Sequence, residues 1–452
     1  MTDKTQSIHG QWSSRFAFIL AATGSAVGLG NIWKFPYITG ENGGGAFVMV
    51  YLLCVAALGI PIMIAEIMLG RRGRQSPINT MKSLAAEAGA DPRWHYLGWC
   101  GMLAGFLILA YYSVIAGWAL AYLVKAFFGV FMNSNAEEIK RLFENLMESP
   151  IQQIFWHTVF MVLTMHYVMR GVQNGLEKAV HFLMPALFVI LILLVAYAMS
   201  SGAYEQGMAF LFNPDFSKID ADAVLTAMGH AFFTLSLGMG AIMVYGSYLP
   251  NHVSIAKTTF FIAGADTVVA LLAGIAIFPL VFANNLEASS GPGLIFQTLP
   301  LAFGHMGGGW LFGLLFFVLL IFAALSSSIS LIEPAVAWLV ENKNLDRRQA
   351  SIWSGSACWL LGVGVVFSFN IWSEVKLFDK NLFQLLDYLT ANLMLPLGGV
   401  AIAIFAGWMM KQSHAEQELE IPAEGFKAWQ FLIKYVAPAA VFLVFLHVLG
   451  VL

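Results

Sequence analysis

The chain has 452 residues, of which 59% are hydrophobic and only 11% charged, and its mean hydropathy is +0.74. In soluble domains about a quarter of the residues are charged. This composition therefore excludes an ordinary soluble protein and indicates a polytopic membrane protein. The net charge of −3 offers no basic surface for nucleic acid. The three cysteines lie inside apolar runs without paired spacing, which argues against a disulfide framework or a zinc site.

Eleven apolar stretches are long enough to cross a bilayer, which takes about 20 residues per crossing. They lie at residues 14–39, 45–69, 95–127, 152–170, 179–200, 224–250, 258–285, 309–340, 350–370, 384–411 and 430–452. The polar stretches between them are too short for separate soluble domains, so we expect one all-α membrane domain over 1–452. Most Lys and Arg residues fall on the side of the N-terminus, which favours a cytoplasmic N-terminus and an external C-terminus.

Flexible and polar residues interrupt the first stretch. The segment GSAVGLGNIWKFP, residues 24–36, contains three glycines together with Asn31 and Lys34, whose side chains would be costly in lipid. Glycines alone also fit close helix packing. The sixth stretch repeats the pattern in FFTLSLGMG, residues 232–240. Because irregular backbone at membrane depth occurs where it lines a cavity, we expect two broken helices.

The two interruptions are five crossings apart, and an odd number of crossings reverses the direction of the chain. The sequence therefore predicts two inverted five-span halves, 1–200 and 224–411, followed by an eleventh helix at 430–452. Broken helices at corresponding positions of inverted halves are typical of the binding site of a secondary transporter. The freed carbonyls suit a dehydrated cation, and the half-helix N-termini suit an anionic group.

Polar residues in other spans extend this candidate site. The serines at 326–328 offer hydroxyls to a monovalent cation near Gly24, or bond the carbonyls of their own helix. Asp266 is an intramembrane acid, which is either a functional residue or a polar lock between helices. Glu66 and Glu333 either link helices or line a pathway.

Several motifs together resemble the neurotransmitter:sodium symporter family, especially its bacterial amino-acid transporters. They are residues 24–36, ENGGGAF at 41–47, GIP at 59–61 with Glu66 and Gly70-Arg71, Tyr111-Tyr112, 233–240 and Ser326-Ser327, and they cover nearly the whole chain. The resemblance implies a LeuT-like fold with helices one and six unwound at mid-membrane. It also implies sodium-coupled import of hydrophobic L-amino acids, aliphatic and aromatic, by alternating access and without enzymatic chemistry.

The resemblance also implies the binding residues. One sodium site would be formed by the substrate carboxylate with Ala26, Asn31, Thr234 and Asp266, and a second by Gly24, Val27, Ala323, Ser326 and Ser327. The substrate would lie among Ala26, Leu29, Gly30, Ile108, Tyr112, Phe233, Thr234, Ser236, Met239, Ser327 and Leu331. Such an uncharged wall favours hydrophobic substrates. The flexible thioether of Met239 favours a broad range of them.

The family pattern further implies gates and a mobile helix. Lys34 is expected to pair with Asp387 in place of the usual arginine, which gives a looser outer gate because lysine lacks the bidentate fork. The inner closure would involve Trp12, Tyr248 and Glu341, with His9 where relatives often carry arginine. Gly175 and Pro185 have the spacing of an unwinding fifth helix, although they also fit a helix start and an ordinary proline.

Asp266 falls where relatives carry asparagine, so a fixed carboxylate is expected to make chloride unnecessary. Other function classes fit less well. Bulky rings at Trp33, Tyr112 and Phe233 argue against an open channel, and no nucleophile–base pair or metal triad indicates a membrane enzyme. A non-transporting amino-acid sensor on the same fold remains an alternative that the sequence does not separate from a transporter.

Overall fold

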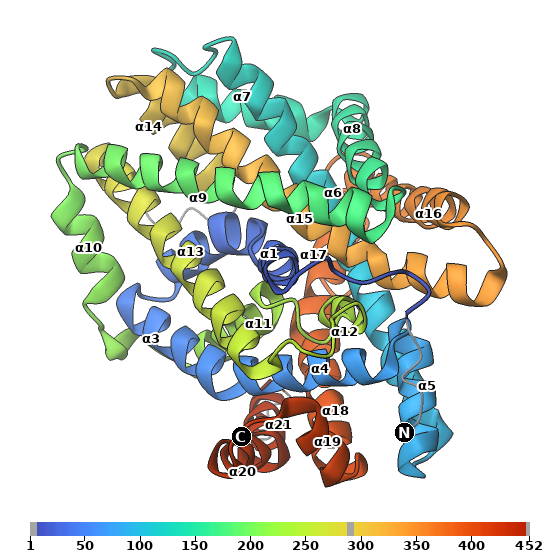
Figure 1. Cartoon of the computed structure of the whole chain (residues 1–452). Coiled ribbons are helices and arrows are strands. Elements are labelled where there is room, and N and C mark those ends of the chain that lie inside the picture. The colour runs from blue at the N-terminus through green and yellow to red at the C-terminus, as the bar shows by residue number, and fades with distance from the viewer. Residues whose placement is uncertain (1–6, 287–292, 449–452) are drawn as a thin grey trace.

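The computed structural model describes residues 7–286 and 293–448, and within these ranges the regular elements are helices, some continued by short 3₁₀ or π-helical turns, η1 to η9. The final residues of the predicted eleventh span, 449–452, lie outside the described part. Figure 1 shows α1, α11 and α12 in the middle of the molecule, with the longer helices around them. The two interrupted segments are therefore enclosed by the rest of the fold.

Each span predicted in the first half corresponds to a helix or a short series of helices. In chain order these are α1 (Arg15–Ala26), η1 (Gly30–Lys34) and α2 (Phe35–Glu41); α3 (Gly45–Cys54), η2 (Val55–Gly59) and α4 (Ile60–Gly73); α6 (His95–Phe127); α8 (Pro150–Val168); and η4 (Val172–Glu177) with α9 (Lys178–Met199). The predicted boundaries differ from the observed ones by a few residues, because helix ends depend on caps rather than on apolarity.

The spans predicted in the second half are also helical. They are α11 (Ala221–Thr234) and α12 (Ala241–Ser247); α13 (Ile255–Ala283); α15 (Gly309–Lys343); α16 (Arg347–Phe367); α17 (Leu382–Asp387), η7 (Tyr388–Met394), α18 (Leu395–Ile404) and η8 (Phe405–Met409); and α20 (Ala423–Phe431), η9 (Leu432–Val436) and α21 (Ala437–Val448). The polar connections carry further short elements: α5 (Pro77–Ala88), η3 (Pro92–Trp94), α7 (Ala136–Glu148), α10 (Tyr204–Phe212), η5 (Phe216–Lys218), η6 (Leu294–Thr298), α14 (Leu299–His305) and α19 (Gln412–Leu419).

Seven helical segments of the described chain are long and apolar enough to cross a membrane, and the bent pair formed by α1 and residues 30–41 makes an eighth. The fourth, sixth and eleventh predicted spans do not meet this criterion by themselves. The sixth fails because its two helices have only 14 and 7 residues. Its interruption is therefore visible in length as well as in composition.

Both central helices break where the sequence places small residues. Helix α1 begins after Ser14, whose side chain accepts a hydrogen bond from Ala17 N, and it ends because Val27 is extended, with φ −71° and ψ 102°. The chain bends by 45° at this break. After α11, the backbone enters the left-handed region at Ser236, Gly238 and Gly240, with φ of 55°, 73° and 74°. Glycine adopts this conformation without steric cost, so two of these three positions favour it.

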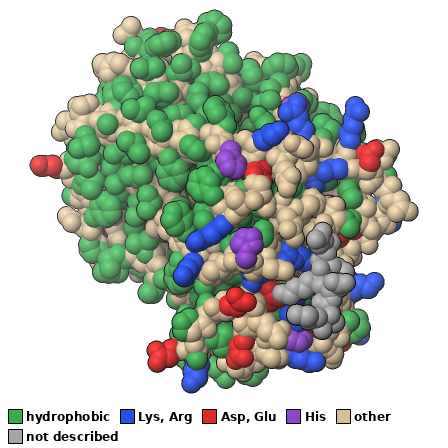
Figure 2. Space-filling model, viewed as in Figure 1, with side chains coloured by type: hydrophobic (Ala, Val, Ile, Leu, Met, Phe, Trp, Pro, Cys, Tyr) green, Lys and Arg blue, Asp and Glu red, His purple; other side chains and the backbone are tan. Residues whose placement is uncertain are grey.

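The outer surface of the molecule has a largely apolar part and a part where charged side chains are more frequent. Figure 2 shows a broad apolar surface toward the upper left and Lys and Arg side chains over the right half of the view, several of them in the direction of α16. Large apolar side chains are exposed on several helices, among them Phe155, Val162, Phe182, Ile192 and Phe261. Extended exposed apolar surface of this kind is expected where a protein faces lipid.

Candidate functional site

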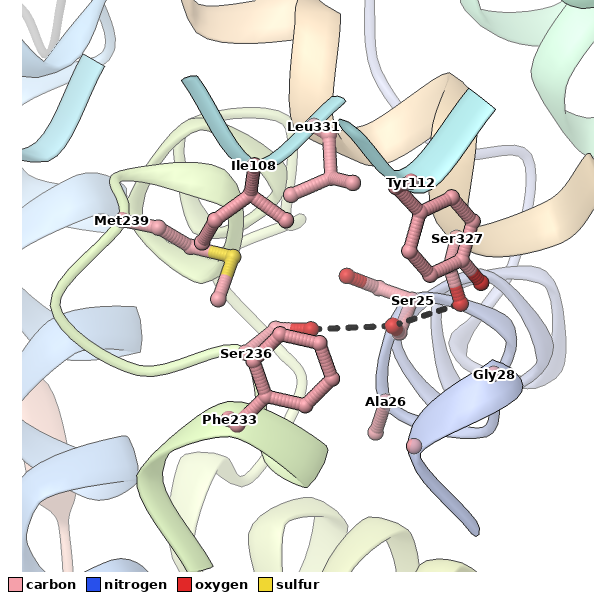
Figure 3. Close-up of a pocket in the computed structure, with 11 residues that line it drawn as sticks. Ser25, Ala26, Gly28, Ile108, Tyr112, Phe233, Ser236, Met239, Ser327 and Leu331 are labelled. Carbon is pink, nitrogen blue, oxygen red and sulfur yellow. Dashed lines mark hydrogen bonds between the residues drawn. The ribbon is translucent and has the colours of Figure 1, made fainter. Parts of the chain in front are cut away.

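A small cavity lies between the two helix breaks (Figure 3). It is lined by Ser25, Ala26, Gly28, Gly30, Ile108, Tyr112, Phe233, Ser236, Met239, Ser327 and Leu331. Nine of these are among the residues expected around the substrate, whereas Leu29 and Thr234 do not line the cavity. Its volume of about 20 Å³ holds little more than one water molecule. A bound amino acid therefore requires the walls to move apart.

Sequence reasoning missed two lining residues, Ser25 and Gly28, although both belong to the interrupted segment 24–36. The Ser25 carbonyl is a junction between helices, because it accepts hydrogen bonds from Ser236 Oγ at 2.9 Å and Ser327 Oγ at 3.1 Å (Figure 3). The Ser25 hydroxyl donates to Ser330 Oγ at 2.7 Å. The first break is thus tied to both the second break and α15.

Tyr112 of α6 brings its phenol to the start of the second half of the first broken helix. Its hydroxyl oxygen accepts a hydrogen bond from Leu29 N at 3.1 Å. Gly28 allows this close approach, since a Cβ atom there would lie 2.9 Å from the Tyr112 hydroxyl and 2.4 Å from Ser327 Oγ. Leu29 therefore belongs to the site through its backbone, even though its side chain lies outside the cavity.

Polar groups of four segments, η1, α3, α11 and α13, meet at the position expected for the first sodium ion. Asn31 Nδ2 donates to Asp266 Oδ1 at 2.7 Å and to the Asp266 carbonyl at 3.1 Å. Tyr51 OH lies 3.4 Å from both Asp266 Oδ2 and Thr234 Oγ1. Tyr51 is a residue that sequence reasoning missed, since one tyrosine in an apolar run gives no distinct signal. Ala26, which is also expected at the first sodium ion, lines the cavity.

Oxygen atoms also converge at the position expected for the second sodium ion. Ser327 Oγ donates to the carbonyls of Gly24 and Val27, each at 3.3 Å. Ser326 Oγ instead bonds carbonyls of its own helix, including that of Ala323 at 3.0 Å. Each of the two predicted roles of the serine cluster is therefore found once. The Ser327 hydroxyl bonds the broken helix, and the Ser326 hydroxyl bonds its own helix. A Cβ atom on Gly24 would lie 3.2 Å from Ser326 Cβ, so the two segments are in close contact.

The donor sets fit small hard cations. One position combines hydroxyl and carbonyl oxygens with a single carboxylate, which the Asn31 amide nitrogen holds in place, and the other uses only neutral oxygens. Hard cations prefer oxygen ligands, and a low ligand charge suits a monovalent ion. Residues Ala26, Asn31, Thr234 and Asp266 would hold sodium at the first position, and Gly24, Val27, Ala323, Ser326 and Ser327 at the second.

The expected ion pair between Lys34 and Asp387 is formed, and it lies beside Phe233 of the cavity wall. Lys34 Nζ lies 3.0 Å from Asp387 Oδ1 and 5.1 Å from the centre of the Phe233 ring. Both charged side chains are partly exposed, so the contact itself contributes little to stability.

On the side of the molecule where the chain enters α1, the preceding segment contacts the end of α12. Trp12 N donates to the Tyr248 carbonyl at 3.1 Å, and Trp12 Nε1 donates to the Tyr245 carbonyl at 3.0 Å. Tyr248 OH donates to Glu333 Oε1 at 2.8 Å, and Glu333 forms a bidentate ion pair with Arg347 at 2.9 and 2.6 Å. Sequence reasoning missed Arg347. Glu333 links helices here, which was one of its two expected roles.

Glu341 belongs to a separate set of contacts on this side. It accepts hydrogen bonds from Ser76 N and Asn79 Nδ2, each at 2.7 Å, and lies 3.0 Å from His9 Nε2. The histidine therefore reaches the carboxylate that relatives pair with arginine. The Tyr248 hydroxyl bonds Glu333 rather than Glu341, so the expected trio is divided between two neighbouring clusters.

Two further expected residues lie in regular structure. Gly175 lies in the π-helical turn η4, where a Cβ atom would be 2.1 Å from the Tyr167 carbonyl oxygen, and Pro185 lies inside the continuous helix α9. The fifth helix is therefore wound in this state. Glu66 Oε2 accepts a hydrogen bond from Gly238 N at 3.3 Å, so this carboxyl group links α4, in the second span, to the second break.

Comparisons with known proteins identify relatives over the full length. The sequence profile described as "Sodium:neurotransmitter symporter family" matches residues 9–141 and 130–451. The chain is 37% identical over 446 residues to "Uncharacterized sodium-dependent transporter YhdH" of Bacillus subtilis, with 98% of each chain covered. It is 25% identical over 485 residues to "Sodium- and chloride-dependent GABA transporter 2" of Homo sapiens, covering 94% of this chain and 77% of the human protein. A solved structure, MhsT in complex with L-phenylalanine, matches with 44% identity and a TM-score of 0.91, covering 97% of this chain and 99% of that one.

Proposed function

Because the chain belongs to the sodium:neurotransmitter symporter family, we propose that it imports hydrophobic L-amino acids, aliphatic and aromatic, together with sodium. Membership makes it a multi-pass, sodium-dependent transporter, and the match to MhsT confirms the predicted all-α LeuT-like fold. The observation that supports the substrate class is the cavity between the two breaks, whose side-chain lining is uncharged. The L-phenylalanine bound to MhsT agrees with this substrate class.

The two ends of an amino acid have different partners in this proposal. The carboxylate lies near the backbone amides at Leu29 and Gly30 and the Tyr112 hydroxyl, because the start of a half-helix favours negative charge. The ammonium group is held by backbone carbonyls and by Ser236 Oγ, which now donates to the Ser25 carbonyl. The apolar side chain lies against Ile108, Met239 and Leu331.

Sodium and substrate complete each other's coordination in this proposal. The substrate carboxylate supplies an oxygen to the sodium ion held by Ala26, Asn31, Thr234 and Asp266, while the second ion joins the first break to α15 through Ser327. Neither ligand has its full set of contacts without the other. The coupling free energy is then reciprocal: bound sodium raises the affinity for the amino acid by the same factor by which the bound amino acid raises the affinity for sodium.

Transport itself is proposed to follow alternating access. The bundle formed by the first, second, sixth and seventh spans rocks against the other spans of the halves 1–200 and 224–411. The Lys34–Asp387 pair closes the external side, and the Trp12 segment closes the cytoplasmic side. Unwinding at Gly175 and Pro185 gives water access to the second sodium ion from the cytoplasm.

Uptake by proteoliposomes tests this function directly. Labelled leucine, phenylalanine, glutamate and lysine are offered with an inward sodium gradient and with equal sodium on both sides. We expect concentrative uptake of leucine and phenylalanine only under the gradient, because sodium supplies the driving force. Accumulation that ignores sodium would contradict symport, and saturable binding without uptake would favour a sensor.

Replacement of Met239 is expected to change substrate preference more than turnover. Its buried thioether lies in the cavity wall facing Ile108 and Phe233. Met239→Ala widens the pocket and should shift the ratio of phenylalanine to leucine uptake several-fold, since even one methylene in an apolar pocket is worth about 1–3 kcal/mol. Competition between the two labelled substrates measures this ratio. An unchanged ratio would exclude Met239 from the substrate wall.

Chloride is not expected to be required. Asp266 places a fixed carboxylate beside Asn31 and Tyr51, and this charge takes the place of a mobile anion near the first sodium site. Exchange of chloride for gluconate on both sides should therefore leave the initial uptake rate unchanged. Asp266→Asn removes the carboxylate, and stimulation of this variant by chloride would support the explanation. A fall in wild-type uptake in gluconate would overturn it.

A further inference from the structure

A groove on the outer surface lies apart from the transport site. It runs between η3 with the start of α6 and one side of α18, and its volume is about 420 Å³. Small-molecule sites range from about 300 to 1,000 Å³, so the groove has the size of a binding site. The residues that matter for its chemistry are Asp91, Arg93, Trp94, Tyr96, Leu397 and Ala401.

The groove is polar at one end and apolar at the other. Asp91 and Arg93 lie just before α6 begins, at the polar end. Leu397 lies 12 residues before the end of its span at Met409, which at 1.5 Å per residue is roughly 18 Å into the membrane. The order of polar and apolar groups therefore follows the order of headgroup and acyl chain in one leaflet of a bilayer.

Aromatic rings mark the level of the headgroups. Tyr96 is 63% exposed, and Trp94 packs edge to face on Phe405 with ring centres 5.2 Å apart. Tryptophan and tyrosine are enriched where hydrocarbon meets polar headgroups. The polar end of the groove thus lies at the membrane–water interface.

The side chains of Asp91 and Arg93, which carry opposite charges, lie at the polar end of the groove without forming an ion pair. Asp91 Oδ1 accepts a hydrogen bond from the backbone N of Arg93 at 2.8 Å, but the two side chains form no ion pair. Within the described residues, the Arg93 guanidinium has no hydrogen bond or ion pair either. One carboxylate and one guanidinium side by side complement a ligand that carries both an ammonium group and a phosphate.

We propose that this groove binds a phospholipid whose headgroup carries a primary ammonium, as in phosphatidylethanolamine. The phosphate contacts Arg93, the ammonium contacts Asp91, and one acyl chain lies along Leu397 and Ala401. A guanidinium suits phosphate because its fixed donors match the geometry of the oxygens. A second copy of the chain fits less well, since it would have to cover two opposite charges at the membrane surface.

Native mass spectrometry of the purified full chain tests the proposal. The protein is mixed with phosphatidylethanolamine, phosphatidylcholine or phosphatidylglycerol of identical acyl chains, and retained lipid is counted. We expect phosphatidylethanolamine to be retained most, because the methylated ammonium of phosphatidylcholine has no hydrogen to donate. Arg93→Gln should lower its retention roughly threefold to tenfold, and Asp91→Asn should lower it to the level of phosphatidylcholine.

Two further variants distinguish binding at this groove from attraction of lipid by the general surface charge. Arg348→Gln removes an exposed arginine at the start of α16 and should leave retention unchanged. Ala401→Phe fills the apolar end and should lower retention of all three lipids. Equal retention of phosphatidylethanolamine and phosphatidylcholine by the wild type would overturn the proposal. So would unchanged retention after Arg93→Gln, or a dimer whose interface covers the groove.

Discussion

Asn31→Ala is expected to weaken sodium binding by roughly 10- to 100-fold. Its side chain joins the first break to α13 through Asp266, and its Oδ1 accepts a hydrogen bond from Gly28 N at 3.1 Å. Alanine removes a cation ligand and leaves the buried Asp266 carboxylate without its amide donor. Hydrogen bonds to charged groups are worth about 1.5–3 kcal/mol, which corresponds to the stated range. Sodium titration of substrate binding by purified protein measures the effect.

A matched substitution tests whether the loss is local. Asn284 follows α13, and its side-chain amide donates to the Leu280 carbonyl of the same helix at 2.8 Å. Asn284→Ala removes the same amide group far along the helix from Asp266, and it should leave the half-saturating sodium concentration unchanged. If Asn31→Ala also left that concentration unchanged, Asn31 would not be a sodium ligand.

Gly28→Ala is expected to lower substrate affinity at least roughly tenfold. The added Cβ atom would lie 2.4 Å from Ser327 Oγ and 2.9 Å from the Tyr112 hydroxyl. Ser327 and Tyr112 would have to move, and both line the cavity and hold the broken helix. Overpacking of this kind costs about 1–3 kcal/mol, and the displaced hydroxyls also belong to the proposed substrate and sodium contacts. Equilibrium binding of labelled leucine and phenylalanine gives the affinity.

Gly264→Ala provides the control for adding a methyl group. A Cβ atom at Gly264, in α13, would meet no heavy atom within 4 Å. This variant should bind substrate normally, and its midpoint of thermal unfolding should stay level or rise, because alanine restricts the unfolded chain. Thermal unfolding of Gly28→Ala separates a local effect on binding from loss of the fold. Normal affinity in a folded Gly28→Ala protein would contradict the close packing at this break.

The sequence predicted the positions of the helices well and their lateral contacts less well. Apolar length located each span, and the clustering of Gly24, Asn31 and Gly240 with other small or polar residues located both breaks. These are local properties of the chain, since helix formation in lipid depends on apolarity and breaks depend on glycine and polar residues. Partners such as Tyr51 and Arg347 gave no local signal, because their roles arise from helices distant in sequence.

The serines at 326–328 also show that the sequence does not predict contacts between helices, even for neighbouring residues in one helical turn. Sequence alone allowed Ser326 and Ser327 equally to face a cation or to bond their own helix. The structure directs Ser327 to the carbonyls of Gly24, Ser25 and Val27 and leaves Ser326 on its own helix. Residues one apart on a helix point about 100° away from each other, and only the packing of α15 on the first break selects which of them faces it.

By itself, the sequence determined the membrane class, the two broken helices and, through its motifs, the family. These features are carried by composition and by short segments, so they do not depend on how the helices pack. The tertiary structure decided which side chains meet: the link between Asn31 and Asp266, the division of the inner contacts between Glu333 and Glu341, and the tightness of the cavity. Such contacts join segments up to hundreds of residues apart, and their geometry is set only when every neighbouring helix is in place.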